Sequence, residues 1–135
     1  MSLLVTLMAA ATAQTAPPSP VAVRNAVERL DLRTFPNALR DRLRMHAPNV
    51  RTFHQMGFPR FVWRGGALEL REDNIWLRSF RPLRAGPGVI RVCFVDQALN
   101  GGTYYARQAL DLRRAAAGFY HARPVEDGRC PRIGD

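Results

Sequence analysis

The alternation of apolar and polar residues around Gly65-Gly66 constrains the fold more than any other feature of this chain. Two apolar residues at alternate positions precede the glycines (Phe61, Trp63), and two follow them (Leu68, Leu70). A period of two is typical of a β-strand with one buried face, and Gly-Gly between two such runs indicates a hairpin turn. The pattern predicts an antiparallel hairpin in which Trp63 lies opposite Leu68.

A second hairpin is expected to turn at Asp73-Asn74, because both residues tolerate positive φ. A two-residue turn there places Leu70 opposite Leu77 and Arg71 opposite Trp76. The two hairpins then agree on which side chains share a face. The expected core face holds Phe61, Trp63, Leu68, Leu70 and Leu77. The expected outer face holds Arg60, Val62, Arg64, Glu69, Arg71, Trp76, Arg78 and Phe80. A slip of one residue would exchange the faces of a strand.

A fourth strand is predicted over residues 89–96, with Arg91, Cys93 and Val95 pointing outward. The chain beyond Asn100-Gly101-Gly102 is ambiguous. Apolar residues at helical spacing favour a helix over 103–117, while a strand through Tyr104-Tyr105 is the alternative. Residues 119–125 fit a short final strand.

Two helices are predicted before the sheet. Ser19-Pro20 combines a good N-cap with proline at the first helical position, and a helix is expected over residues 20–31. A second helix is expected over residues 36–46, because Leu39 and Leu43 are four apart and Pro48 stops it. The predicted class is α+β, with N-terminal helices packed on a four- or five-stranded antiparallel meander sheet.

The N-terminus resembles an export signal. Residues 3–11 form an apolar run that is too short to span a bilayer, and an A-x-A site follows it. The expected signal peptide covers residues 1–13, with cleavage before Gln14, or after Ala16 as the alternative. Residues 14–19 would be an extended Pro-rich segment and 20–135 a single globular domain. Because no Lys or Arg precedes the apolar run, an N-terminal helix packed on the domain remains open, as does a start codon further upstream. A periplasmic or secreted location is predicted.

The two cysteines, Cys93 and Cys130, are expected to form one disulfide in an exported chain. The bond would pin the polar C-terminal tail onto the sheet and stabilise the fold by roughly 4 kcal/mol. Metal binding or a catalytic thiol is the alternative, although the chain has no C-x-x-C spacing.

The chain is strongly basic, with a net charge of +9 and arginine in every basic position. Such a chain attracts polyanions at low salt, and guanidinium groups bind carboxylates or phosphates in pairs of hydrogen bonds. The predicted outer face combines arginines with aromatic rings. The candidate ligand-binding residues are Arg64, Arg71, Trp76, Arg78 and Arg91. The alternative is an ordinary face that water or a helix covers.

Signatures of catalysis are weak. His46, His54 and His121 share no metal-binding spacing, so no metal or other cofactor is predicted. The candidate carboxylates are Glu69, Glu72, Asp73, Asp96, Asp111, Glu126 and Asp127.

The predicted function is therefore a non-enzymatic binding or inhibitor-type protein for an anionic partner, either an acidic protein or an envelope polymer. One alternative is a small secreted hydrolase using a carboxylate/His pair. A nucleic-acid binder is a minor alternative that applies if the chain is not exported. The oligomeric state stays open.

Overall fold

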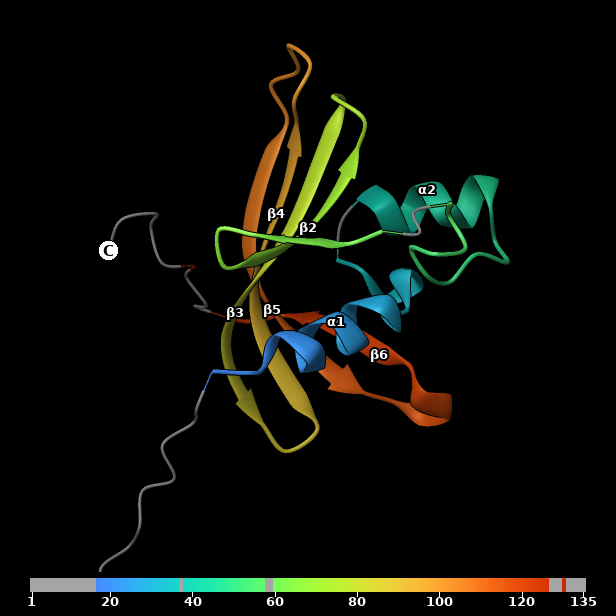
Figure 1. The fold of residues 1–135 in the computed structure, drawn as a ribbon. Helices are drawn as coiled ribbons and strands as arrows, with labels where there is room; N and C mark the ends of the chain where they lie inside the picture. The colour runs from blue at the N-terminus through green and yellow to red at the C-terminus, as the bar shows by residue number, and fades with distance from the viewer. Residues whose placement is uncertain (1–16, 37, 58–59, 127–129, 131–135) are drawn as a thin grey trace, which may run out of the picture.

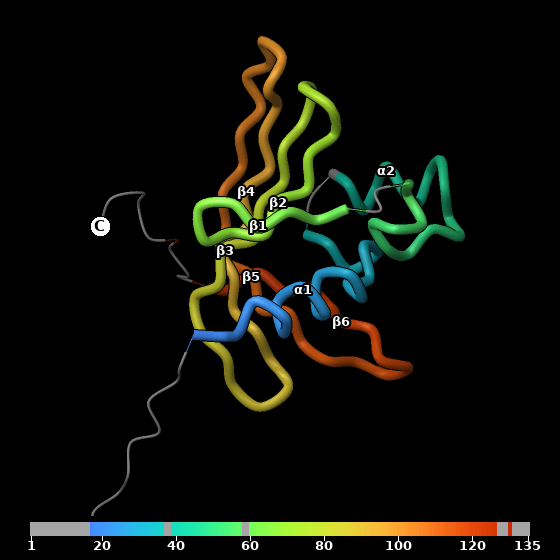
Figure 2. The backbone as a smooth tube through the Cα atoms, viewed as in Figure 1, coloured from blue at the N-terminus to red at the C-terminus, as the bar shows by residue number. Residues whose placement is uncertain are grey.

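Six antiparallel strands form one sheet, and each strand pairs with the next strand along the chain. The computed structural model describes residues 17–36, 38–57, 60–126 and 130. The strands are β1 (Val62–Arg64), β2 (Ala67–Glu72), β3 (Trp76–Gly86), β4 (Val89–Ala98), β5 (Tyr105–Arg114) and β6 (Tyr120–Pro124). Figure 2 shows the chain crossing the sheet one strand at a time. The α+β class is confirmed, but the sheet has six strands rather than four or five.

Two helices precede the sheet and lie on the same side of it (Figure 1). Helix α1 (Pro20–Glu28) begins where Ser19 Oγ accepts a hydrogen bond from the Ala22 amide at 3.2 Å, as the capping pattern predicts. Helix α2 (Ala38–His46) follows a short 3₁₀ turn, Leu32–Thr34. Within the described part of the chain, neither helix has the length and apolar character needed to cross a membrane.

The core lies between these helices and the sheet face that they cover. Its centre is a set of fully or almost fully buried phenylalanines, one of which comes from the segment between the helices (Phe35) and two from neighbouring strands (Phe80, Phe94). The ring centroids of Phe35 and Phe94 are 4.8 Å apart, and those of Phe80 and Phe94 are 5.0 Å apart. We call the face that carries Phe80 and Phe94 the inner face and the opposite one the outer face.

The first hairpin has the predicted register. Trp63 pairs with Leu68, and the turn residues Gly65 and Gly66 have φ values of 59° and 76°. Both glycines therefore adopt the left-handed conformation that a two-residue turn of this kind requires.

The predicted register of the second hairpin is wrong by one residue. Leu70 pairs with Arg78 and Arg71 with Leu77, because the loop spans three residues, Asp73 to Ile75, instead of two. The Ile75 amide donates to the Glu72 carbonyl at 3.0 Å, and Asp73 takes a φ of 46°. The added residue exchanges the two faces of β3.

Three residues expected on the outer face consequently lie on the inner one: Trp76, Arg78 and Phe80. Leu77, expected in the core, lies on the outer face and is only partly buried. Phe80 is completely buried, so the observed register encloses the larger apolar side chain.

The helix expected over residues 103–117 is also wrong, because β5 occupies most of that segment. Nine residue pairs join β5 to β4. Leu110 and Leu112 point inward at a spacing of two, which outweighs the helical spacing of the other apolar residues. The alternative strand at Tyr105 and the short final strand, β6, are both observed.

The predicted disulfide joins Cys93 of β4 to Cys130, with the two Cα atoms 5.4 Å apart. Cys93 lies on the outer face, as expected, so the bond attaches residue 130 to that side of the sheet. The expected signal peptide, residues 1–13, lies outside the described residues.

Candidate functional site

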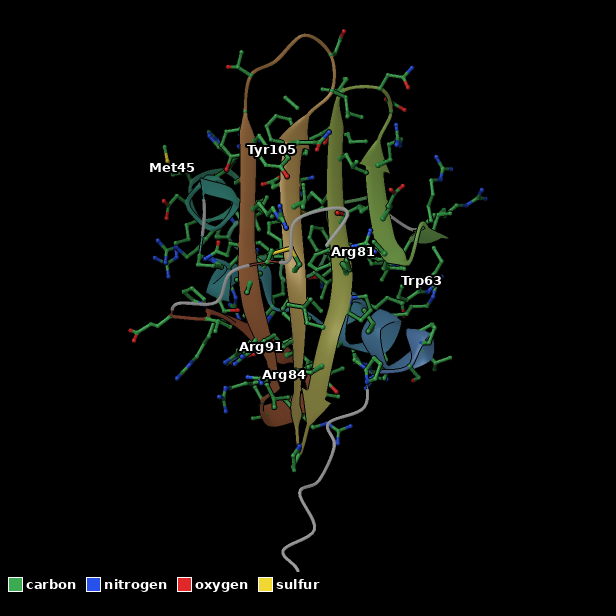
Figure 3. The ribbon with its side chains drawn as sticks, turned by 90° about the vertical axis from the view of Figure 1, so that its left-hand side faces the viewer. Met45, Trp63, Arg81, Arg84, Arg91 and Tyr105 are labelled. Atoms are coloured by element: carbon green, nitrogen blue, oxygen red, sulfur yellow. A yellow bond between two sulfur atoms is a disulfide. The ribbon has the colours of Figure 1, made fainter. Side chains whose placement is uncertain are left out.

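The five predicted site residues do not form one surface. Arg64 and Arg71 are exposed on the outer face, as expected. Trp76 and Arg78 lie on the inner face, and Arg78 is only 5% exposed. Arg91 is on the outer face but nearer the other end of β4 (Figure 3).

None of the helices in the described part of the chain covers the outer face, which is turned toward the viewer in Figure 3. A hollow of about 200 Å³ lies on it, and we call this the outer hollow. Its lining residues come from all of the first five strands: Arg64, Ala67, Glu69, Leu77, Ser79, Arg81, Cys93, Val95, Gln97, Tyr105 and Arg107.

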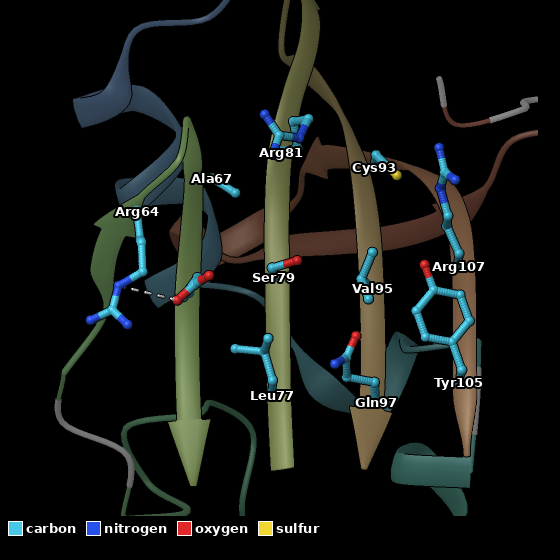
Figure 4. A pocket seen from close by; sticks show the side chains of 11 residues that line it. Arg64, Ala67, Leu77, Ser79, Arg81, Cys93, Val95, Gln97, Tyr105 and Arg107 are labelled. Carbon is cyan, nitrogen blue, oxygen red and sulfur yellow. Dashed lines mark ion pairs between the residues drawn. The ribbon is translucent and has the colours of Figure 1, made fainter. Parts of the chain in front are cut away.

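The outer hollow exists because small side chains occupy outward positions on neighbouring strands. Ala67, Ser79 and Cys93 form part of its floor on β2, β3 and β4 (Figure 4). Longer side chains stand around them, including Arg81 on β3 and Arg107 on β5. Side chains at alternate positions of a strand share a face, so one strand contributes both floor and rim.

Three arginines and one glutamate give the outer hollow a positive charge. Arg64 Nε lies 3.8 Å from a carboxylate oxygen of Glu69, a loose pair in which the Arg64 side chain is 65% exposed. Arg81 is exposed and forms no ion pair with any described residue. Arg107 Nη2 donates to the Cys130 carbonyl at 3.0 Å, so the disulfide-linked segment helps to orient this side chain.

Arg91, in contrast, is already held by a carboxylate of the chain. Its Nε and Nη2 donate to the two oxygens of Asp111 at 2.8 and 3.0 Å. These hydrogen bonds are the main cause that lowers the pKa of Asp111 and raises the pKa of Arg91. A ligand would have to compete with Asp111 for this guanidinium, so Arg91 is a poorer candidate than the sequence indicates.

A wider concavity lies beside β6. Its lining includes Asp31, His121 and three arginines: Arg33, Arg44 and Arg51. Asp31 is only 3% exposed. Its carboxylate accepts from Arg33 Nε and Nη2 at 3.1 Å and from Arg51 Nη2 at 3.0 Å.

Burial is the largest single influence on Asp31, and it raises the pKa of this carboxyl. The hydrogen bonds from Arg33 and Arg51 together have a larger, opposite effect and hold the pKa at about 2. A carboxylate with so low a pKa is a weak general base near neutral pH. This carboxylate/His pair therefore gives little support to hydrolysis, and its contacts fit the structural role of joining the helical layer to the sheet.

Asp31 is not one of the candidate carboxylates predicted from the sequence, and those, apart from the Arg91-bound Asp111, are dispersed. Glu69 lines the outer hollow, Glu72 and Asp73 flank the second hairpin turn, and Asp96 is buried beside Arg78. Asp127 lies outside the described residues. No group of three or more His, Cys, Asp or Glu side chains able to hold a metal occurs within the described ranges.

Sequence reasoning missed three prominent residues of the outer hollow: Arg81, Tyr105 and Arg107. Arg81 follows the last residue assigned to the third strand, and the other two lie in the segment expected to be a helix. The signal for β5 was its alternation of Gln108, Leu110 and Leu112 with Arg107, Ala109 and Asp111.

Comparisons with protein-family models, with curated proteins and with solved structures find no match to this chain.

Proposed function

We propose that this chain is an exported, non-enzymatic binding protein that holds an acidic segment of another protein in the outer hollow. The observation that carries the proposal is the presence of three arginines, Arg64, Arg81 and Arg107, around the rim of a hollow on a sheet face that none of the described helices covers. Guanidinium groups bind carboxylates with charge-assisted, often bidentate hydrogen bonds.

The apolar part of the lining favours a protein over a sulfated or phosphorylated polymer. Leu77 and Val95 are partly exposed between the arginines, and Tyr105 is 56% exposed. An acidic peptide can place carboxylates on the arginines and apolar side chains on these surfaces. A charged polysaccharide has no comparable apolar side chains. Its contacts with the outer hollow should therefore contribute less binding free energy than those of an acidic peptide.

Export is part of the proposal and rests on the apolar N-terminal run together with the disulfide. Disulfides persist mainly in oxidising compartments. Mass spectrometry of the chain recovered from the periplasm or medium should find Gln14 at the N-terminus. Recovery of the chain only from the cytosol, with residues 1–13 attached, would contradict export.

The binding test uses an acidic probe peptide of alternating glutamate and leucine. Binding to the oxidised chain is measured by calorimetry at about 0.15 M salt. This salt screens long-range electrostatic attraction, so binding that persists requires direct contacts with a site. We expect saturable binding to this peptide and none to the glutamine/leucine counterpart. Arg81→Gln with Arg107→Gln should weaken binding at least about tenfold.

The matched control is Arg44→Gln with Arg114→Gln, which removes the same charge from exposed positions outside the outer hollow. This control should bind the peptide like the unmodified chain. Equal losses in the two double variants would mean that net charge alone attracts the peptide and would overturn the proposal. Tighter binding of a sulfated oligosaccharide or an oligonucleotide, lost in the Arg81/Arg107 variant, would replace the acidic protein with that class of partner.

A further inference from the structure

A second hollow, which we call the inner hollow, lies between α2 and the inner face of the sheet. It measures about 260 Å³ and is lined by Leu39, Arg42, Trp76, Arg78, Asp96 and Tyr104. These residues come from α2, β3, β4 and the segment just before β5. They include two of the candidate residues that the shifted register removed from the outer face, Trp76 and Arg78.

Two aromatic rings are fixed in the lining of the inner hollow. The ring centroids of Trp76 and Tyr104 are 5.3 Å apart, with a tilt of 31° between the planes. Trp76 Nε1 donates a hydrogen bond to Asp96 Oδ1, which restrains the indole. Tyr104 is 42% exposed and therefore forms an accessible part of this aromatic pair.

Arg78 supplies a buried cation in the same lining. Its Nε lies 3.4 Å from Asp96 Oδ1, but this buried nitrogen has no hydrogen-bond acceptor among the described residues. Its guanidinium carbon also lies 5.7 Å from the centroid of the Trp76 ring. A buried donor without an acceptor costs free energy. Arg78 also lines the hollow, where a ligand oxygen can approach its side chain.

Arg42 adds a second positive charge from the exposed side of α2. Burial lowers the pKa of Arg78 most strongly, the nearby Asp96 raises it, and the charge of Arg42 lowers it further. Glu72, outside the lining, also raises the pKa of Arg78, and the lining itself, with two arginines and one aspartate, carries a net charge of +1. One negative charge on a ligand would balance it.

We propose that the inner hollow binds a small aromatic carboxylate, with its ring against Trp76 and Tyr104 and its carboxylate between Arg42 and Arg78. The size of the hollow favours one ring, because pockets for drug-sized molecules start at about 300 Å³. Rings attract one another through offset or tilted contacts, and arginine provides the paired donors that a carboxylate accepts. This site uses the opposite face of β3 from the outer hollow, so it does not rest on the proposed acidic-protein function.

The test titrates benzoate, phenylacetate and phenylpropionate into the oxidised full chain. In a Trp63→Phe background, Trp76 is the single tryptophan and its fluorescence reports on the inner hollow. We expect a saturable change with a Kd of about 1 mM or tighter for at least one of these acids. Phenylacetamide lacks the charge and acetate lacks the ring, so each should bind at least about tenfold more weakly.

Arg42→Gln is the informative variant because Arg42 is exposed, whereas Arg78→Gln alters a buried residue and can prevent folding. It should weaken binding of the best acid at least about tenfold. Arg44→Gln, on the same helix but outside the inner hollow, should leave that binding unchanged. Binding of the acidic probe peptide should be unaffected by Arg42→Gln, which separates this proposal from the proposed function.

Three results would overturn the inner site. The first is the absence of a saturable signal with all three acids. The second is equal binding of phenylacetate and phenylacetamide. The third is an equal loss of binding in Arg42→Gln and Arg44→Gln, which would indicate a general effect of charge.

Discussion

The two faces of β3 place the same residue type in opposite environments. Arg78 points inward, is buried beside Asp96 and lines a hollow under α2. Arg81 points outward, is exposed and stands at the rim of the outer hollow. The basic composition of the chain therefore does not define one binding surface. Strand register decides which arginines are available to a large partner and which can only contact a small ligand.

The substitution with the largest expected loss of stability tests which side of β3 faces the core. Phe80→Ala should destabilise the fold by about 4 kcal/mol, because it leaves a cavity among buried rings. Leu77→Ala, on the outer face of the same strand, should cost less than about 1 kcal/mol, since Leu77 is only partly buried. Urea unfolding measures both. The observed register would be contradicted if Leu77→Ala were the more damaging change.

Removal of the disulfide should have the next largest effect. Cys93→Ala with Cys130→Ala frees a loop with a sequence separation of 37, and the loss should be about 3.8 kcal/mol on the chain-entropy model. Chemical denaturation of the double variant measures it, and the reduced unmodified chain serves as the control. A double variant as stable as the oxidised chain would mean that the link between residue 130 and the outer face contributes nothing to folding.

Asp31 connects the helical layer to the inner face near β6, and its contribution should depend on pH. Its pKa is about 2 in the folded chain against an ordinary value of 3.8. A lowered pKa stabilises the fold above about pH 4, and this stabilisation is lost as pH falls toward 2. Asp31→Asn should cost about 2 kcal/mol at neutral pH, because two arginines lose their charged acceptor.

Thermal melts of both chains from pH 7 down to pH 2 check this prediction. The gap in stability between the unmodified chain and Asp31→Asn should narrow as the pH falls through this window. A constant gap would mean that the Asp31 charge does not stabilise the fold.

The smallest expected effect concerns the ion pair of Arg91 and Asp111 on the outer face. Arg91→Gln should destabilise the fold by about 1 kcal/mol, and less at high salt, because the Arg91 side chain is 26% exposed. Its affinity for the acidic probe peptide should not change, since Arg91 lies outside the outer hollow. Loss of peptide binding in this variant would extend the site along β4.

The parts of the fold that the sequence predicted are those with strong local signals. Gly65 and Gly66 both have positive φ and specify a two-residue turn, so the first register followed from the sequence. Asp73-Asn74 tolerates a turn without specifying its length, and the added loop residue Ile75 exchanged the faces of β3. The alternation of residues in β4 was also sufficient to predict that Cys93 points to the outer face.

The candidate site was less predictable because its residues come together only through pairing between strands. Arg81 and Arg107 are distant in sequence, and the β4 strand between them brings them to one hollow. The helical spacing of Tyr105, Ala109 and Leu112 favoured a helix, whereas pairing with β4 made this segment a strand. Local periodicity does not include that long-range pairing.

The most direct test of the division between the two faces is the reactivity of Arg78 and Arg81 in the folded chain. Phenylglyoxal modifies accessible guanidinium groups, and mass spectrometry locates the modified residues. We predict that Arg81 reacts as fast as exposed Arg44, while Arg78 reacts at least about tenfold more slowly. The stable product carries two phenylglyoxal molecules on one guanidinium, and the inner hollow has room for one ring only. Arg78 reacting as fast as Arg81 would contradict the register of β3 and the assignment of both hollows.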